Sequence, residues 1–209
     1  MTKVEANIVD LRTDTPRSNE AFFVDTNVWY WMGYTNASHS SLSYPAMNYQ
    51  VTSYPNYLND ALAAESELHV CTLSFAELAH IIERTEREIY NSTHGTNIKT
   101  KKFRRDFPTE YANVHTEVEN AWLLAVGISN NQVIEANVTE LMVTSATSQM
   151  KVSTLDGYDL FIIEALRAKK ITQVITDDSD FGSVAGITVY TANRNLINDA
   201  RSQGMLLTR

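Results

Sequence analysis

Residues 21–28 read Ala21-Phe-Phe-Val-Asp25-Thr-Asn-Val28, a short apolar run that ends at an aspartate. Such a run, without polar alternation, is typical of a strand buried on both faces of a sheet. Further short apolar runs occupy residues 68–72, 171–176 and 187–190, with helical patterns in the intervals. Strands that alternate with helices predict an α/β fold, in which helices cover both faces of a parallel sheet.

Acidic residues stand at the ends of these strands or in the first turn of the helices that follow. In a parallel sheet these places lie at one edge, where ligands bind. Several carboxylates meeting there would raise one another's pKa unless a cation joined them. Ligands that offer only oxygen suit a hard cation, Mg²⁺ or Mn²⁺. The acidic residues in these places are Asp25, Glu77, Asp159, Asp178 and Asp180.

Each acidic residue also has a purely structural interpretation. Ser74 and Glu77 fit a capping box at a helix that opens at Ser74. Asp156 is suited to be a helix N-cap, which would make Asp159 a first-turn acid favoured by the helix dipole. Asp177, Asp178 and Asp180 fit the role of turn formers, and Asp177 is expected to point away from the other carboxylates. The metal-site interpretation therefore rests on the whole set rather than on any one residue.

Four motifs and a closing strand, in this order, resemble the PIN-domain ribonucleases, the superfamily that includes VapC-type toxins. The resemblance covers about residues 21–191. The matching stretches are Phe-Phe-Val-Asp25-Thr26-Asn27-Val28, Thr72-Leu-Ser-Phe-Ala-Glu77-Leu78, Tyr158-Asp159-Leu-Phe-Ile-Ile-Glu-Ala165, Val174-Ile-Thr176-Asp-Asp178-Ser-Asp180-Phe181 and Gly186-Ile-Thr-Val189.

The resemblance implies a three-layer α/β/α sandwich with a central parallel sheet, a PIN-like and Rossmann-like fold. It also implies metal-dependent cleavage of RNA, with Mg²⁺ or Mn²⁺ as cofactor. The implied catalytic and metal-binding residues are Asp25, Glu77, Asp159, Asp178 and Asp180. Thr26 and Thr176 are expected to orient these ligands, or a water molecule, through their hydroxyls.

Length and composition indicate an ordinary globular protein. With 209 residues, we expect one domain over residues 21–209, preceded by a flexible segment at residues 1–20. Long insertions are expected near residues 33–65 and 83–108. The single cysteine excludes an internal disulfide, and no stretch is apolar enough to span a membrane or to act as a secretory signal. These features predict a cytoplasmic protein.

The formal net charge of −8 argues against binding nucleic acid through bulk electrostatics, so any RNA contact must be local. One basic cluster is a candidate, formed by Lys99, Lys101, Lys102, Arg104 and Arg105, with aromatic residues interleaved. The alternative is a solvated loop whose aromatics anchor it to the core. Tyrosines 44, 49, 54 and 57 are either core residues or a partner surface.

The resulting hypothesis is a metal-dependent endoribonuclease that hydrolyses RNA phosphodiester bonds, such as the toxin of a toxin–antitoxin pair. Its partners would be an RNA substrate and a small antitoxin, with a homodimer left open and no membrane partner. Two alternatives remain: a catalytically inactive PIN-fold scaffold that binds RNA or protein, and an RNA-processing or DNA-directed nuclease of the same superfamily.

Overall fold

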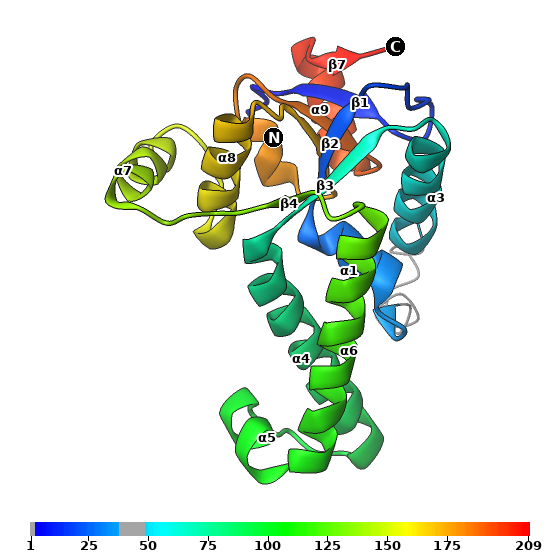
Figure 1. Ribbon diagram of the computed structural model, residues 1–209, viewed down its shortest axis with the longest axis vertical. Coiled ribbons are helices and arrows are strands. Elements are labelled where there is room, and N and C mark those ends of the chain that lie inside the picture. Colours follow the sequence, from blue (N-terminus) through cyan, green and yellow to red (C-terminus); the bar gives the residue numbers. More distant parts are fainter. Residues whose placement is uncertain (1–2, 38–48) are drawn as a thin grey trace.

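Figure 1 shows the computed structural model, which describes residues 3–37 and 49–209. Its centre is a sheet of seven strands in the order β4-β3-β2-β5-β6-β1-β7, and all the strand pairs are parallel. The predicted α/β class is therefore confirmed. The strands are β1 (Asn7–Asp10), β2 (Ala21–Val24), β3 (Glu67–Cys71), β4 (Val133–Ile134), β5 (Gln173–Ile175), β6 (Thr188–Thr191) and β7 (Leu206–Leu207).

Helices cover both faces of the sheet and produce two hydrophobic cores. Successive residues of one strand serve opposite cores: Phe22 packs into one and Phe23 into the other, both with no exposed surface. This alternation follows from the two-residue period of a strand. The first core lies under α1 (Thr26–Gly33), α3 (Gln50–Ala63), α4 (Thr72–His94) and α6 (Pro108–Ile128); the second lies under α7 (Glu140–Gln149), α8 (Gly157–Lys169) and α9 (Arg194–Gln203).

The expectation of a flexible segment at residues 1–20 is corrected at β1. Residues Asn7–Asp10 form a strand between β6 and β7, paired with Thr188–Thr191. Ile8 and Val9 are buried on opposite faces of the sheet. Ile8 and Val9 stand between polar residues, which is too weak a signal to predict a strand from the sequence. In the structure, backbone hydrogen bonds to β6 hold them in place.

The region near residues 33–65, expected to be a long insertion, contains a helix that packs on the sheet. α3 runs without a break from Gln50 to Ala63. Tyr54 and Tyr57 are buried in its core, which favours the core interpretation of these tyrosines, and Tyr49 is half-buried. Tyr44 lies outside the described residues.

The region near residues 83–108 extends away from the sheet. The long helices α4 and α6 leave it side by side, and α5 (Thr100–Asp106) packs against both at the far end (Figure 1). The charged sequence from residue 83 to 94 is therefore the exposed continuation of α4. In the described part of the chain, no helix combines the length and the apolar character that crossing a membrane requires.

Candidate metal centre

Asp25 sits at the point where β2 ends and α1 begins. Its side chain caps α1, with Oδ1 accepting a hydrogen bond from the Thr26 amide at 2.6 Å. Oδ2 accepts the Thr176 hydroxyl at 2.7 Å. The carboxylate is only 3% exposed, so the strand end and the cap together hold it in one orientation.

Glu77 comes from the first turns of α4, which starts at Thr72 rather than at Ser74. The predicted capping box is absent: the Ser74 hydroxyl is buried without a hydrogen-bond partner, and Cys71 occupies the cap position. Glu77 instead accepts a hydrogen bond from the Thr26 hydroxyl. The side chain therefore points towards α1 and Asp25. In a capping box it would instead point back to the first residues of α4.

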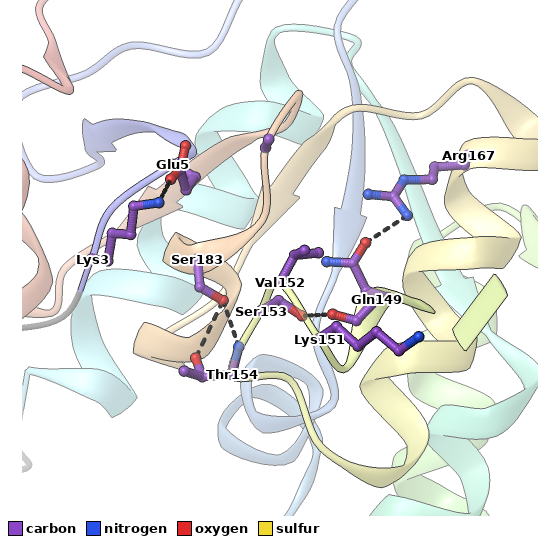
Figure 2. A pocket seen from close by; sticks show the side chains of 10 residues that line it. Lys3, Glu5, Gln149, Lys151, Val152, Ser153, Thr154, Arg167 and Ser183 are labelled. Atoms are coloured by element: carbon purple, nitrogen blue, oxygen red, sulfur yellow. Dashed lines mark hydrogen bonds and ion pairs between the residues drawn. The ribbon is translucent and has the colours of Figure 1, made fainter. Parts of the chain in front are cut away.

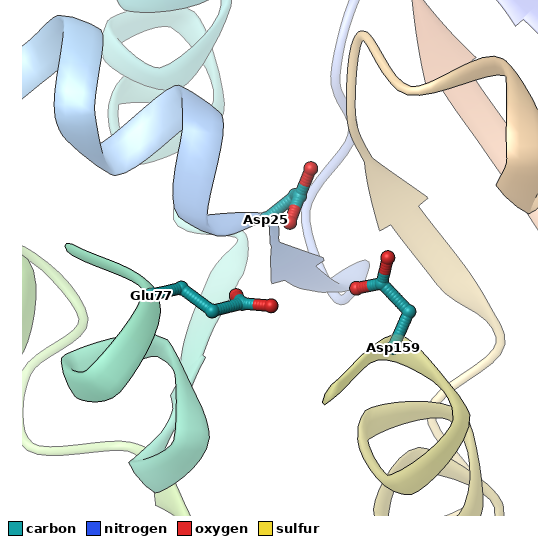
Figure 3. A group of neighbouring side chains, drawn as sticks. All are labelled: Asp25, Glu77 and Asp159. Carbon is teal, nitrogen blue, oxygen red and sulfur yellow. The ribbon is translucent and has the colours of Figure 1, made fainter. Parts of the chain in front are cut away.

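Asp159 enters from the opposite side, in the first turn of α8. It is 9% exposed, and no hydrogen bond from a described residue reaches its carboxylate. One oxygen each from Asp25, Glu77 and Asp159 lie within 4.8 Å of one another. Figure 3 shows the three side chains converging from three separate elements. We call these three residues the acid cluster.

The electrostatics of the acid cluster are those of crowded negative charge. Burial raises the pKa of Asp25 and of Asp159, and the neighbouring carboxylates raise both further. Burial also raises the pKa of Glu77, with Asp156 and Asp178 adding to the effect. Among the described residues, no lysine, arginine or histidine forms an ion pair with any of the three. The fold thus brings three carboxyl groups together without an ion pair from a described residue, which is the arrangement that raises their pKa values.

Asp178 lines the same pocket as the acid cluster, although its oxygens are outside the 4.8 Å group. It caps the short 3-10 helix Ser179–Ser183 by accepting a hydrogen bond from the Asp180 amide at 2.8 Å. Burial raises its pKa, and the charges of Asp180 and Asp156 act in the same direction. Asp180 itself does not line this pocket, and its carboxylate accepts the Thr154 hydroxyl at 2.9 Å.

The two threonines predicted to orient the ligands form hydrogen bonds that suit this role. Thr26 donates its hydroxyl to Glu77, and its amide donates to Asp25. Thr176 donates its hydroxyl to Asp25 and accepts the Asp178 amide at 2.9 Å. The end of β5 is thereby tied to the end of β2, which fixes the position of Asp25 relative to Asp178.

The two neighbouring aspartates differ from each other. Asp177 points away from the pocket and is held by the hydroxyls of Tyr49 and Tyr54 and by the amide of Gln50. Asp156 occupies the cap position of α8, but its side chain makes no capping hydrogen bond. It is exposed, and its charge raises the pKa of Glu77, Asp159 and Asp178. Asp156 is therefore the N-cap residue of α8, as expected, although its side chain supplies no capping hydrogen bond.

The predicted basic cluster divides into two groups. Arg104 forms a two-pronged ion pair with Glu83, a residue only 4% exposed, so most of its charge is already balanced. The other members are exposed, and Lys101, Lys102 and Arg105 lie on the outer side of α5, opposite buried Phe103. The structure does not bring these residues into the pocket of the acid cluster.

Two aromatic residues at this pocket received no role from the sequence. His80 and Tyr158 line it, and their rings lie 6.5 Å apart between centroids. Each follows a simple pattern: His80 is one helical turn after Glu77, and Tyr158 directly precedes Asp159. A search of the helix faces next to the acids would have found both.

A larger cavity of about 720 Å³ lies elsewhere, between the N-terminal segment and the helices α7 and α8 (Figure 2). Among its charged side chains, Lys3 pairs with Glu5, and Arg167 donates to Gln149 at 2.9 Å and to Glu164 at 2.7 Å, whereas Lys151 forms no ion pair with a described residue. Thr154 and Ser183 form its wall, and they link to Asp180. The described carboxylates that crowd together without an ion pair line a smaller pocket, of about 230 Å³, at the acid cluster.

The chemistry of the acid cluster fits a divalent cation. The donors are all carboxylate oxygens, the pocket has room beside them, and two threonine hydroxyls steady the ligands. A hard cation such as Mg²⁺ or Mn²⁺ would balance the charge that otherwise raises the pKa of each carboxyl. A soft-metal site is excluded here, because the only cysteine lies buried in β3 and no histidine belongs to the group.

The fold and the site define an α/β protein with a carboxylate cluster at the carboxyl edge of a parallel sheet. The sequence matches no family model, and no curated protein matches it. One solved structure with a similar backbone is VapBC2 from Rickettsia felis bound to a DNA fragment from their promoter. It is 14% identical, covers 82% of this chain and 98% of its own, and aligns with a TM-score of 0.44. This similarity is too low to indicate a shared activity.

Proposed function

We propose that the protein is a metal-dependent nuclease that hydrolyses RNA phosphodiester bonds, with Mg²⁺ or Mn²⁺ held by Asp25, Glu77 and Asp159. The observation that carries the proposal is the convergence of these three carboxylates, from three elements, without a balancing cation. Asp178 is proposed as a fourth ligand because it lines the same pocket. Asp180 is proposed to act through the loop of Asp178, whose side chain accepts its amide.

The resemblance of the four motifs to PIN-domain ribonucleases supports the choice of RNA over other phosphodiesters. In the sequence, the first, second, third and fourth acids of that pattern correspond to Asp25, Glu77, Asp159 and Asp178. All four line one pocket. A structural role for each acid separately would not require them to meet.

The reaction proposed is in-line hydrolysis, in which water forms a bond to phosphorus and the bond to the 3′-oxygen breaks. A divalent cation in the pocket would lower the pKa of water and neutralise charge on the phosphodiester. The chain supplies the geometry: Thr176 fixes Asp25, and Thr26 fixes Glu77. A pocket carboxylate accepts the proton of the attacking water, and solvent returns a proton to the leaving 3′-oxygen.

The biological role that we propose is that of a toxin paired with a small antitoxin. The motif resemblance to VapC-type toxins is its support. A gene for a small antitoxin-like protein directly beside this one, and loss of growth inhibition when both are expressed together, would test this part independently of the chemistry.

The direct test uses purified protein and labelled mixed-sequence RNA, with Mn²⁺ or with EDTA. Cleavage is expected only with the metal, and Asp159→Asn is expected to abolish it while the far-ultraviolet circular dichroism stays that of the wild type. Asp177→Asn is the matched control, because the same change there lies outside the pocket. RNA cleavage by Asp159→Asn at the wild-type rate would refute the proposal, as would a wild type that cleaves no RNA but binds a protein partner tightly.

A further inference from the structure

A groove next to the acid cluster carries the opposite charge. It has a volume of about 370 Å³ and is lined by α4 and the inner side of α5. Three arginines face it against one glutamate: Arg84, Arg87 and Arg104, with Glu83. We call this the arginine groove. On a protein with a formal net charge of −8, it is a local site where a polyanion could bind.

The arginine groove and the pocket of the acid cluster share a wall. His80 and Ile81 line both. On α4, Glu77, His80, Ile81, Arg84 and Arg87 have the spacing i, i+3, i+4, i+7 and i+10, which places them along one helix face. At 1.5 Å per residue, Arg84 lies about 10 Å and Arg87 about 15 Å along the helix from Glu77. The arginine groove and the pocket of the acid cluster therefore lie next to each other along one face of α4.

The three arginines are not equally free. Arg104 is held by Glu83. Arg87 donates to the Ile98 carbonyl and to Glu88, and its Nε is buried without a partner. Arg84 is exposed, and no hydrogen bond or ion pair joins its side chain to a described residue. Arg84 therefore has the cation most available to a ligand, and Arg87 adds fixed positive potential behind it.

We propose that the arginine groove binds the sugar–phosphate backbone of single-stranded RNA on one side of the bond to be cleaved, with Arg84 contacting a phosphate and His80 lying between this phosphate and the acid cluster. The inference rests on the proposed function and adds the path of the substrate. A polyanion is favoured over an isolated phosphate because the groove shares His80 and Ile81 with the pocket of the acid cluster, so one extended ligand can reach both. It replaces the outer lysines of α5 as the main RNA contact.

The test compares charge reversals that change the net charge by the same amount. Arg84→Glu is placed in the arginine groove and Lys101→Glu on the outer side of α5. The control, Lys169→Glu, is at the last residue of α8, about 15 Å along that helix from Asp159. A milder variant, Arg84→Gln, removes the cation without adding an anion. Binding of a fluorescein-labelled mixed-sequence RNA is measured by anisotropy in Ca²⁺ across a range of salt concentrations, and cleavage in Mn²⁺.

Both Arg84 variants are expected to weaken RNA binding and to reduce the slope of log affinity against log salt by about 0.7, the value for one phosphate contact on a single strand. KM should rise several-fold with kcat nearly unchanged, because Arg84 is too far from the reacting atoms to act on them. Stabilisation by Mn²⁺ alone should match the wild type, since the acid cluster is untouched. Lys101→Glu and Lys169→Glu should change the slope by less.

The outcomes separate this inference from the proposed function. If the wild type cleaves RNA and the Arg84 variants keep its KM and its salt slope, the groove assignment is wrong and the nuclease proposal stands. If Lys101→Glu has the larger effect, the substrate lies on the outer side of α5. If the wild type binds no RNA at any salt concentration, both proposals fail.

Discussion

The two ends of β2 carry carboxylates in opposite electrostatic states. Glu20, just before the strand, and Asp14 share the guanidinium of Arg209, which bonds Asp14 with both Nε and Nη2. Burial acts to raise the pKa of Asp14 and Glu20, but the hydrogen bonds and charge of Arg209, with further hydrogen bonds from the Tyr57 hydroxyl to Asp14 and the Arg17 amide to Glu20, together outweigh it, and the pKa of both is lowered. At the other end, Asp25 has no cation, and its pKa is raised.

The difference indicates that the pairing of Asp14 and Glu20 with Arg209 stabilises the fold. At the first end the chain supplies its own cation, whose guanidinium also lies 4.8 Å from the centroid of the Tyr190 ring. That arrangement is complete without a ligand. At the second end, Thr176 holds Asp25 and Thr26 holds Glu77 close to Asp159, and no lysine, arginine or histidine in the described part of the chain forms an ion pair with any of the three. Such an uncompensated arrangement indicates a binding site. The following changes test this contrast, from the largest expected effect to the smallest.

Removing one negative charge at each end should have opposite consequences. Asp25→Asn is expected to lower metal-dependent RNA cleavage by at least about 1,000-fold, or about 4 kcal/mol in the barrier. The free energy of unfolding without metal should stay the same or rise, because repulsion is eased. Glu20→Gln should leave cleavage unchanged and destabilise the fold. Urea denaturation and a cleavage assay on both variants check this; equal behaviour of the two would remove the contrast.

Removing Arg209 should leave Asp14 and Glu20 without an ion pair, as the acid cluster is. Arg209→Ala removes the cation that pairs with Asp14 and Glu20 and should destabilise the protein by about 3 kcal/mol, the lower range for breaking a buried pair. Chemical denaturation measures the loss. Arg209→Lys keeps the charge but cannot reach both carboxylates with the same geometry. Its free energy of unfolding should therefore lie between those of the wild type and Arg209→Ala. A stability of Arg209→Ala equal to the wild type would show that the pairing contributes nothing.

A divalent cation bound at the acid cluster should stabilise the fold, as Arg209 does beside Asp14 and Glu20. A divalent ion that binds only the folded state stabilises it by about 2.7 kcal/mol at 100 times its Kd. We therefore expect Mn²⁺ to raise the melting temperature of the wild type and to have little effect on a double variant, Asp25→Asn with Asp159→Asn. Thermal melts with and without EDTA provide the measurement. An equal rise in the double variant would place the ion elsewhere.

The pH dependence of stability without metal should have opposite signs at the two ends. The acid cluster has raised pKa values in the folded state, so its contribution is most favourable below the ordinary carboxyl pKa and is lost as the pH rises through the raised values. Asp14 and Glu20 have lowered values, so their contribution is present above about pH 4 and is lost as the pH falls through the lowered values.

The protein in EDTA is therefore expected to be most stable at mildly acidic pH. For each proton by which the folded and unfolded states differ, the free energy of unfolding changes by about 1.4 kcal/mol per pH unit. Urea denaturation from about pH 4 to pH 8 should show stability falling on the alkaline side, and Mn²⁺ or Asp25→Asn should flatten that fall. A profile unaffected by either would mean that the carboxylates are not crowded in solution.

The local sequence was enough to predict the strands that carry the site. Apolar runs such as residues 21–24 indicated strands buried on both faces, and their alternation with helices predicted the parallel sheet. The predicted edge at which carboxylates gather followed from that topology, since parallel strands end on the same side. Asp25, Glu77 and Asp159 do come within reach of one ion there. β1 was missed because its signal is two apolar residues and its partners are far along the chain.

The sequence by itself determined which residue types stand at the strand ends, because position along a strand or helix is a local property. Only the tertiary structure decided their partners. Arg209 reaches Asp14 and Glu20 from the far end of the sequence, and Glu83 holds Arg104 across two helices. Likewise, the packing of α5 on α4 creates the arginine groove beside the acid cluster. Whether a buried carboxylate is balanced or left to bind a cation depends on which charges the folded chain brings near it, and no local pattern contains that information.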